Sequence, residues 1–459
     1  MRYLKFIAII VFCFCIVITF ALVGCKSTDI KSTDIITEET DTTEKDATEG
    51  SVTIHILLQD LLDNTITASL IPEFEKATGI KVECEIISYY DQHPKLISSF
   101  MSPTGTYDVL EVDNYWAGEF PAADWIIPLD EYVKRDNFDV SVYIPSTLDL
   151  TGYYPRNPRE GEQQKLYMIP YYTYSMGLIY RTDLMNDTKL QETYKELYNK
   201  DLMLPETLEE YVQLCGFMQN NAGVYGASMQ AQRGDNITME WSNYLFAVGG
   251  DYYDENWNAI INDSKAVKAV ELYMENISNN APEGALSYNF EDALRIMSAG
   301  EAFSMITYIL TMPYLVDPES SKIVDNVAMV SMPGEMGLGG TFGWAIASNS
   351  QYKEEAWEFI KWVESFDIAK KRALAGGAPA RADLFIDKDV NKKYPFYPSL
   401  GEVVAKSKPV PEFQYSTDLV EILGRELSLI CTGGKGIQEG LDAAAAELNQ
   451  LAIKAGLQK

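Results

Sequence analysis

The sequence predicts an α/β protein with more than one sheet, and three observations carry that prediction. The stretch 51–59 is an apolar run with strand character, 69–79 is a short amphipathic segment closing on Gly79, and 80–87 alternates like a second strand. Strand, helix and strand within about 40 residues form a βαβ unit, which begins a parallel sheet. The part of the chain from Ser51 to Lys459 is too long for a single core and suits two lobes.

Later segments continue the same alternation. The run 107–113 is predicted as the next strand, and a helix is expected to begin after Leu129. Helices are predicted over 205–218, 265–278, 354–365 and 437–456, where apolar residues recur on one helical face. Strands are expected at 326–333 and 343–348.

The N-terminus has the layout of a secretory signal. Arg2 and Lys5 precede a predominantly apolar run from Phe6 to Val23, which predicts a signal peptide over residues 1–24. The run is also long enough for a membrane-spanning helix, so an uncleaved anchor is the alternative. The stretch 22–25, Leu-Val-Gly-Cys, resembles a bacterial lipobox, which implies that Cys25 is lipidated. Both interpretations place the rest of the chain outside the cytoplasm, tethered to a membrane at its extracellular face.

Residues 25–50 are predicted to be the lipidated cysteine followed by a disordered acidic tether. Residues 26–50 contain eight acidic and no aromatic side chains, and the sequence KSTDI occurs twice in succession. Such a composition cannot bury enough apolar surface to offset its ordering entropy. We therefore expect a solvated linker that holds the folded part away from the membrane.

Composition excludes several classes of function. The formal net charge is −30, and residues 1–24 contribute +2 of it, which leaves −32 for the remainder. Nucleic acid is therefore not expected as a partner, because it requires a basic footprint. Only two histidines are present, and Cys84, Cys215 and Cys431 are far apart, so no catalytic pairing, disulfide framework or metal motif is indicated. The sequence predicts no cofactor and no enzyme activity.

Four blocks of the chain resemble a known family. Residues 107–133, 167–185, 242–276 and 339–365 are similar, in this order, to family 1 extracellular solute-binding proteins, the sugar-binding and polyol-binding lipoproteins of bacterial ABC importers. The resemblance runs from about Val52 to the C-terminus. It implies a two-lobed periplasmic-binding-protein-like fold, in which each lobe is a sheet flanked by helices and the ligand cleft lies between the lobes. Closure of the lobes about a hinge is then expected.

The resemblance also implies where the chain passes between lobes. The crossings are expected near Pro170, Ala347 and Gly377. The N-terminal lobe would then comprise residues 51–169 and 348–377, and the C-terminal lobe residues 170–347 and 378–459.

A sugar offers C–H faces to aromatic rings and hydroxyl groups to polar side chains, so a cleft with both is expected. In open α/β sheets such ligands bind at the loops that follow strands. The residues that combine these features are Gln59, Asp60, Asp113, Asn114, Tyr115, Trp116, Tyr171, Tyr172, Gln230, Arg233, Trp241, Tyr308, Gly340, Phe342, Trp344 and Arg381. Trp116 and Trp344 are predicted as stacking walls, whereas Trp357 has the spacing of a structural helix residue. Arg381 has a second interpretation, a pair with a carboxylate across the hinge.

The function predicted from these features is capture of a small sugar, short oligosaccharide or polyol and its delivery to the transmembrane permease subunits of an ABC transporter. The protein is expected to act as a monomer. Two alternatives stay open: a surface-tethered glycoside hydrolase, which requires two positioned carboxylates, and a sensing or adhesive lipoprotein without a transport role.

Overall fold

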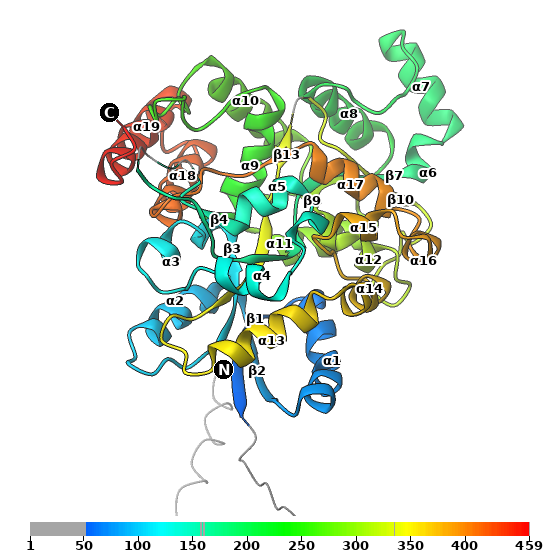
Figure 1. Cartoon of the computed structure of the whole chain (residues 1–459). Helices are drawn as coiled ribbons and strands as arrows, with labels where there is room; N and C mark the ends of the chain where they lie inside the picture. Colours follow the sequence, from blue (N-terminus) through cyan, green and yellow to red (C-terminus); the bar gives the residue numbers. More distant parts are fainter. Residues whose placement is uncertain (1–51, 157, 159–160, 335, 459) are drawn as a thin grey trace, which may run out of the picture. The chain divides into compact units, whose positions relative to one another are not determined.

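Two β-sheets, each with helices packed against it, organise the chain (Figure 1). The computed structural model describes residues 52–156, 158, 161–334 and 336–458. The predicted signal peptide, Cys25 and the acidic tether lie outside the described residues.

The first sheet has five strands in the order β2-β1-β3-β12-β6. Strands β1 (Thr53–Gln59), β2 (Lys81–Ile87) and β3 (Val109–Asp113) are parallel, and β12 (Thr341–Ile346) runs antiparallel to both β3 and β6 (Ile169–Thr173). The βαβ unit predicted from the first segments is confirmed. Its helix α1 (Leu62–Thr78) begins earlier than residue 69 and ends at Gly79, which has a φ of 77°, a conformation that glycine adopts without strain.

The second sheet has four strands in the order β10-β7-β9-β8. Strands β7 (Met176–Arg181) and β10 (Val327–Val330) are antiparallel neighbours, β7 is antiparallel to β9 (Ala302–Tyr308), and β8 (Tyr225–Ser228) is parallel to β9. The alternation of strands and helices therefore builds two α/β units, as predicted.

Helices pack on both sheets, or on other helices, through buried apolar faces. In the first unit they include α1, α2 (Tyr89–Phe100) and α13 (Lys353–Val363); in the second they include α8 (Leu208–Asn221), α9 (Asp235–Ala247), α10 (Ser264–Asn279), α11 (Phe290–Ser298), α18 (Ser416–Cys431) and α19 (Ile437–Lys454). Of these, α18 and α19 pack on α9 and α10. Helix α10 shows the pattern plainly. Asp263 accepts hydrogen bonds from the backbone N–H of Lys265 and Ala266, and the side chains predicted for one face, Val270 and Tyr273 among them, are buried.

Shorter elements complete the fold. They are α3 (Glu119–Ala122), α4 (Asp130–Asp136), α5 (Pro145–Thr147), α6 (Thr182–Met185), α7 (Thr188–Tyr198), α12 (Met312–Leu315), α14 (Phe366–Leu374), α15 (Ala382–Phe385), α16 (Lys388–Lys393), α17 (Tyr397–Ala405), the 3₁₀ turn η1 (Asn114–Trp116), and the paired strands β4 (Tyr153–Tyr154) with β5 (Lys165–Leu166) and β11 (Gly337–Leu338) with β13 (Ser407–Lys408).

Sheet membership differs from the predicted lobe assignment at two places. Residues 170–173 and 341–346 were assigned to the C-terminal lobe, but β6 and β12 pair within the first sheet. The segment 378–380 also lies beside β6, where the Thr173 N–H donates to the Ala378 carbonyl and the Ala380 N–H to the Tyr171 carbonyl. The changes of sheet in these two stretches therefore follow Thr173 and precede Thr341.

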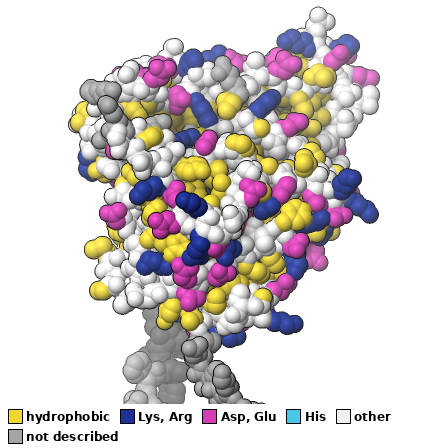
Figure 2. All heavy atoms as spheres, viewed as in Figure 1, with side chains coloured by type: hydrophobic (Ala, Val, Ile, Leu, Met, Phe, Trp, Pro, Cys, Tyr) yellow, Lys and Arg dark blue, Asp and Glu magenta, His cyan; other side chains and the backbone are white. Residues whose placement is uncertain are grey.

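Charges of both signs lie on the face of the molecule that Figure 2 shows. Figure 2 shows acidic and basic side chains interspersed on the face in view, with apolar side chains between them. Within the part of the chain that the structure describes, no helix is both long and apolar enough to cross a membrane. The thiols of Cys84, Cys215 and Cys431 are free, and Cys215 is buried.

Candidate functional site

Asp113 is the last residue of β3 and lies almost fully buried, at 2% exposure, where the two units meet. Its carboxylate accepts a hydrogen bond from the Tyr89 hydroxyl at 2.9 Å and one from the Tyr174 hydroxyl at 2.7 Å. The backbone N–H of Tyr115 also donates to it, which starts the turn η1. Burial raises the pKa of Asp113 to about 7, against these hydrogen bonds, which lower it. We call Asp113 and the residues around it the Asp113 cluster.

Asn114 joins the cluster to distant parts of the chain. Its Nδ2 donates to Glu412 Oε1 at 2.6 Å, and its Oδ1 accepts from the Thr341 N–H at 3.1 Å. Arg156 Nη1 donates to the other carboxylate oxygen of Glu412 at 3.1 Å. Burial raises the pKa of Glu412 to about 8, although Arg156 and Asn114 both act to lower it. Arg156 and Glu412 were not predicted, because only the fold brings them next to Asn114.

Aromatic rings enclose Asp113. Trp116 stacks on Tyr89, with ring centroids 5.9 Å apart and an interplanar angle of 14°. Phe342 lies against Tyr174, with centroids 5.3 Å apart, and against the edge of Tyr89 at 6.3 Å. The structure thus brings together Asp113, Asn114, Trp116 and Phe342, four of the residues that the sequence analysis proposed for the cleft. Tyr89 and Tyr174 were missed, although Tyr174 lies in one of the four blocks that carry the family resemblance.

Gly340 permits the close approach of Tyr174. A Cβ atom at residue 340 would lie 2.0 Å from two ring carbons of Tyr174, a separation that no real Cβ contact shows. The glycine therefore supports the cluster through its lack of a side chain.

The second unit faces the cluster with α9 and the end of β9. The Tyr174 and Tyr308 rings are 5.8 Å apart, the Tyr115 hydroxyl contacts Met239 Sδ, and Asn236 Nδ2 donates to the Tyr90 hydroxyl at 3.2 Å. Contacts from α2, η1 and β6 thus reach α9 and β9 directly.

Asp235, the first residue of α9, is partly buried at this junction. Burial raises the pKa of Tyr89, Tyr115 and Tyr308 well above the ordinary value, and the charge of Asp235 raises each further. The charge of Asp235 therefore acts on all three phenols. The sequence analysis passed over Asp235, even though it lies between the predicted residues Gln230 and Trp241.

Gln230 is buried beside Tyr308, and neither its Oε1 nor its Nε2 has a hydrogen-bond partner of regular geometry among the described residues. An unpaired buried amide costs free energy unless a ligand or water satisfies it. Trp241 is fully buried too, and its indole N–H is likewise unpaired. No ring contact or hydrogen bond within the described chain links Trp241 to the Asp113 cluster.

A polar layer lies directly beneath Asp113 in the first sheet. Glu111, two residues earlier on β3, accepts hydrogen bonds from Asn64 Nδ2 at 2.9 Å, from the Tyr172 hydroxyl at 2.5 Å and from the Gln59 N–H at 2.7 Å. The predicted residues Gln59 and Tyr172 therefore support the cluster from below, through a carboxylate that the sequence analysis did not single out.

Trp344, Tyr171 and Arg381 lie deeper in the first unit. Trp344 is fully buried, its Nε1 donates to Glu364 at 3.0 Å, and its ring lies 4.1 Å from that of Tyr171. Arg381 pairs with Asp383 at 2.7 Å and donates to the Glu364 carbonyl. We therefore retain ligand contact as a prediction for Trp116 and Phe342 but not for Trp344. Asp60 and Arg233 are exposed, and no described contact joins them to the cluster.

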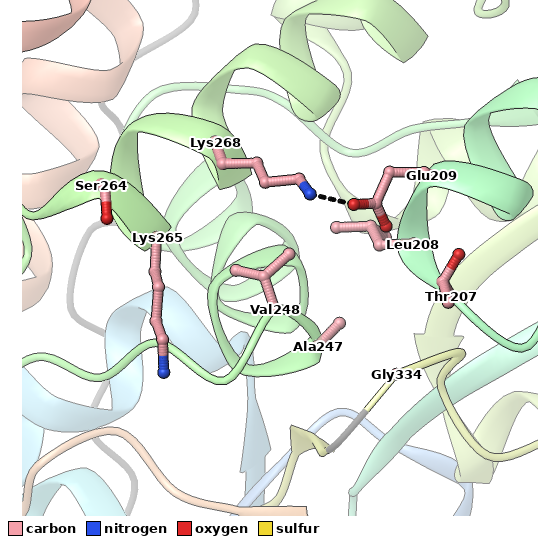
Figure 3. Close-up of a pocket in the computed structure, with 9 residues that line it drawn as sticks. All are labelled: Thr207, Leu208, Glu209, Ala247, Val248, Ser264, Lys265, Lys268 and Gly334. Carbon is pink, nitrogen blue, oxygen red and sulfur yellow. Dashed lines mark ion pairs between the residues drawn. The ribbon is translucent and has the colours of Figure 1, made fainter.

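A separate hollow of about 560 Å³ lies among α8, α9 and α10 (Figure 3). Lys268 and Glu209, which line the hollow, form an ion pair, and Lys265 also lines it. The residues that line it include no aromatic ring and none of the Asp113 cluster. It therefore lacks the stacking surfaces that a sugar site uses. No group of histidine, cysteine or carboxylate side chains in the described ranges is arranged to hold a metal ion.

The two α/β units and the polar, aromatic cluster at their junction define a two-lobed binding protein. Residues 60–368 match the model of the bacterial extracellular solute-binding protein family, and the chain belongs to this family. It is 26% identical, over 75% of its length and 77% of the relative's, to a probable amino-acid ABC transporter periplasmic-binding protein of Sinorhizobium fredii.

Two further similarities concern polyol-binding proteins. The chain is 23% identical to the mannitol-binding protein of Pseudomonas aeruginosa, over 80% of this chain and 85% of that one. It also resembles the crystal structure of an ABC transporter solute-binding protein from Agrobacterium radiobacter in complex with ribitol, with a TM-score of 0.76, 26% identity, and coverage of 87% of this chain and 98% of the other.

Proposed function

We propose that this protein captures a polyhydroxy compound, a polyol or a small sugar, at the Asp113 cluster and delivers it to the permease of an ABC importer. The observation that carries the proposal is a carboxylate held among four aromatic rings at the junction of the two units. Hydroxyl groups pair with carboxylates and amides, and sugar C–H faces pack on rings. The mannitol-binding relative and the ribitol complex support this class of ligand.

An amino acid fits the cluster less well. Its α-carboxylate needs a basic partner, and no lysine or arginine of the described chain contacts Asp113 or Asp235. Arg156, which is joined to Asn114 through Glu412, is already paired with Glu412.

Ligand binding is proposed to close the two units on each other. We assign residues 52–173 and 341–380 to the first lobe and residues 176–338 and 382–458 to the second, because the strands within these ranges pair in separate sheets. A ligand between Asp113 on one side and Gln230 on the other would contact both lobes. Such differential contacts stabilise the closed state.

We propose that the protein is anchored by lipid on Cys25, following removal of residues 1–24. The lipobox-like stretch and the acidic segment behind it support this proposal. Mass analysis of membrane-extracted protein should show residues 1–24 removed and an acyl-glyceryl group added. An unmodified, full-length N-terminus would contradict it.

A role without catalysis is proposed, because the family binds substrates for import. The glycoside hydrolase alternative predicts release of reducing sugar from oligosaccharides incubated with the protein, and we expect none. The sensing or adhesive alternative predicts a gene without permease genes beside it.

A thermal-shift screen over polyols and small sugars tests the proposed function. A ligand at 100 times its dissociation constant should stabilise the protein by about 2.7 kcal/mol, which is visible as a raised melting temperature. We expect at least one polyol or monosaccharide to do so. If every polyol and sugar leaves the melting temperature unchanged and an amino acid raises it, the proposed ligand class is wrong.

A further inference from the structure

Three carboxylates at the candidate site have no basic partner. They are Asp113, Asp235 and Glu240, and none forms an ion pair with a lysine or arginine of the described chain. Glu240 is buried beneath Gln230, whose backbone N–H donates to it at 2.8 Å, and it also accepts from the Tyr273 hydroxyl at 3.3 Å. The partners of Asp113 and Glu240 are neutral phenols and backbone N–H groups.

Some other buried carboxylates of the chain have basic partners. Glu364 pairs with Arg372 at 2.7 Å, and Glu426 pairs with Lys435 at 2.6 Å. Glu111 has no basic partner either, but the side chains of Gln59, Asn64, Gln92 and Tyr172 and a backbone N–H donate to it. Asp113, Asp235 and Glu240 thus lie at the candidate site without a lysine or arginine partner among the described residues.

Asp235 is the one of the three whose carboxylate has no hydrogen-bond donor from another side chain in the described residues. The charge of Asp235 acts on the phenols of Tyr89, Tyr115 and Tyr308 and on Asp113, and the charge of Glu421 on α18 acts on Asp235. The nearby Gln230 amide is also unpaired. A carboxylate and a buried amide without hydrogen-bond partners of regular geometry thus both act on Tyr308, and they leave hydrogen-bonding capacity for a ligand.

We propose that this site selects ligands by charge: amine-bearing polyhydroxy compounds bind more tightly than their neutral counterparts, carboxylated ones are rejected, and Asp235 is the specificity-determining residue. A ligand ammonium would receive the partner that the protein does not supply, as a hydrogen-bonded ion pair with Asp235. A ligand carboxylate would be placed among like charges in a desolvated site, which is strongly unfavourable. The inference rests on the proposed function and specifies its substrate class.

Matched ligands that differ only in charge test this proposal by calorimetric titration. For a hexitol they are glucitol, 1-amino-1-deoxyglucitol and gluconate; for a pentitol, ribitol, 1-amino-1-deoxyribitol and ribonate. If only ring sugars bind in the thermal-shift screen, glucose, glucosamine and glucuronate replace them. We expect the amine to bind at least about tenfold more tightly than the neutral compound and the carboxylate at least about tenfold more weakly.

Asp235→Asn keeps the shape of the side chain and removes its charge. This variant should lose most of the preference for the amine over the neutral compound, whatever its affinity for the neutral compound. The matched control is Asp367→Asn, an exposed aspartate in the first turn of α14, which changes the net charge equally and should keep the preference.

The outcomes separate the two claims. If the neutral ligand binds but its carboxylate form binds equally well, or Asp235→Asn keeps the full preference for the amine, charge selection by Asp235 is wrong and the proposed function stands. If no neutral, amine-bearing or carboxylated member of any series binds, the proposed function itself fails.

Discussion

At the scale of single residues, the two tryptophans predicted as equivalent walls have different surroundings. Trp116 is one of the aromatic side chains that enclose Asp113. Trp344 on β12 lies opposite Glu111 on β3 in the strand register, two residues further along the sheet from Asp113. Phe342 and Trp344 share a face of β12, because side chains two residues apart point to the same side of a strand. That period predicts a common face for the two rings, but it does not tell which of them reaches the edge of the sheet.

Substitution of Trp344 by phenylalanine tests this distinction. Trp344→Phe removes the donor to buried Glu364 and leaves a small cavity, so the free energy of unfolding should fall by about 2–4 kcal/mol. Ligand affinity measured on the folded protein should stay within about threefold of wild type. Tyr89→Phe is the contrast: it removes a donor to Asp113 and should weaken binding with less effect on stability. Loss of binding by Trp344→Phe at unchanged stability would restore it as a cleft wall.

Residues of the site could be predicted from sequence only when local pattern marks them. Asp113, Asn114 and Trp116 follow a strand and were found, because ligands bind where strands end. Tyr89, Glu111, Asp235 and Glu412 were missed. Their importance comes from long-range contacts, such as that of Glu412 with Asn114, which no spacing along the chain reveals.

At the scale of elements, the close packing of β12 against β6 shapes the site. The Tyr174 N–H donates to the Gly340 carbonyl, and the Tyr174 ring covers the space in which a side chain at 340 would stand. Tyr174 and Gly340 lie where the chain passes between the sheets. Their contact thus also positions the Tyr174 hydroxyl to donate its hydrogen bond to Asp113.

Gly340→Ala should therefore weaken ligand binding. The added methyl group must displace the Tyr174 ring, which removes one of the two phenol hydrogen bonds to Asp113, and we expect affinity to fall about tenfold or more. Gly401→Ala is the matched control. Gly401 lies in helix α17, and a Cβ atom added there would make only ordinary contacts with Phe385. Calorimetric titration of both variants measures the change in ligand affinity. Unchanged affinity of Gly340→Ala would show that Tyr174 does not shape the site.

The elements themselves followed from the sequence more closely than the lobe boundaries. Helix α10 and strands β1, β2 and β3 lie close to the predicted segments, because apolar periodicity marks them. The predicted lobe boundaries placed residues 170–173 of β6 and all of β12 in the C-terminal lobe, whereas both strands pair in the first sheet. Strand pairing is not encoded in either strand alone. Helix α1 extends over the polar residues Asp63, Asn64 and Thr67, which are buried against partners elsewhere in the first unit.

At the scale of the whole molecule, buried carboxylates determine how stability depends on pH. Burial, the largest effect on each, raises the pKa of Asp63 to about 6, of Glu111, Asp113 and Glu364 to about 7, and of Glu240 and Glu412 to about 8. Each folded-state pKa lies above the unfolded value, so the native state binds more protons between about pH 4 and pH 8. Stability contributed in this way is present at low pH and is lost as pH rises through the folded-state values.

The ligand-free protein should consequently be more stable at about pH 5.5 than at about pH 8, by at least about 1 kcal/mol. Repulsion within a chain of net charge −30 acts in the same direction as its carboxylates ionise. Chemical denaturation at the two pH values, in the same salt, measures the difference. Greater stability at pH 8 would mean that these carboxylates are ionised at little cost in the native state.

The central claim, that the ligand binds at Asp113, is tested most directly by calorimetric titration of Asp113→Asn and of the wild type. The titrant is the polyol or sugar that most stabilises the protein. Asparagine preserves the size of the side chain but halves its acceptor capacity and removes its charge. We predict one ligand per wild-type chain and a dissociation constant at least about tenfold larger for Asp113→Asn, with the free energy of unfolding of the apo variant little changed or increased. Equal affinities of the two proteins would place the ligand elsewhere and contradict the account.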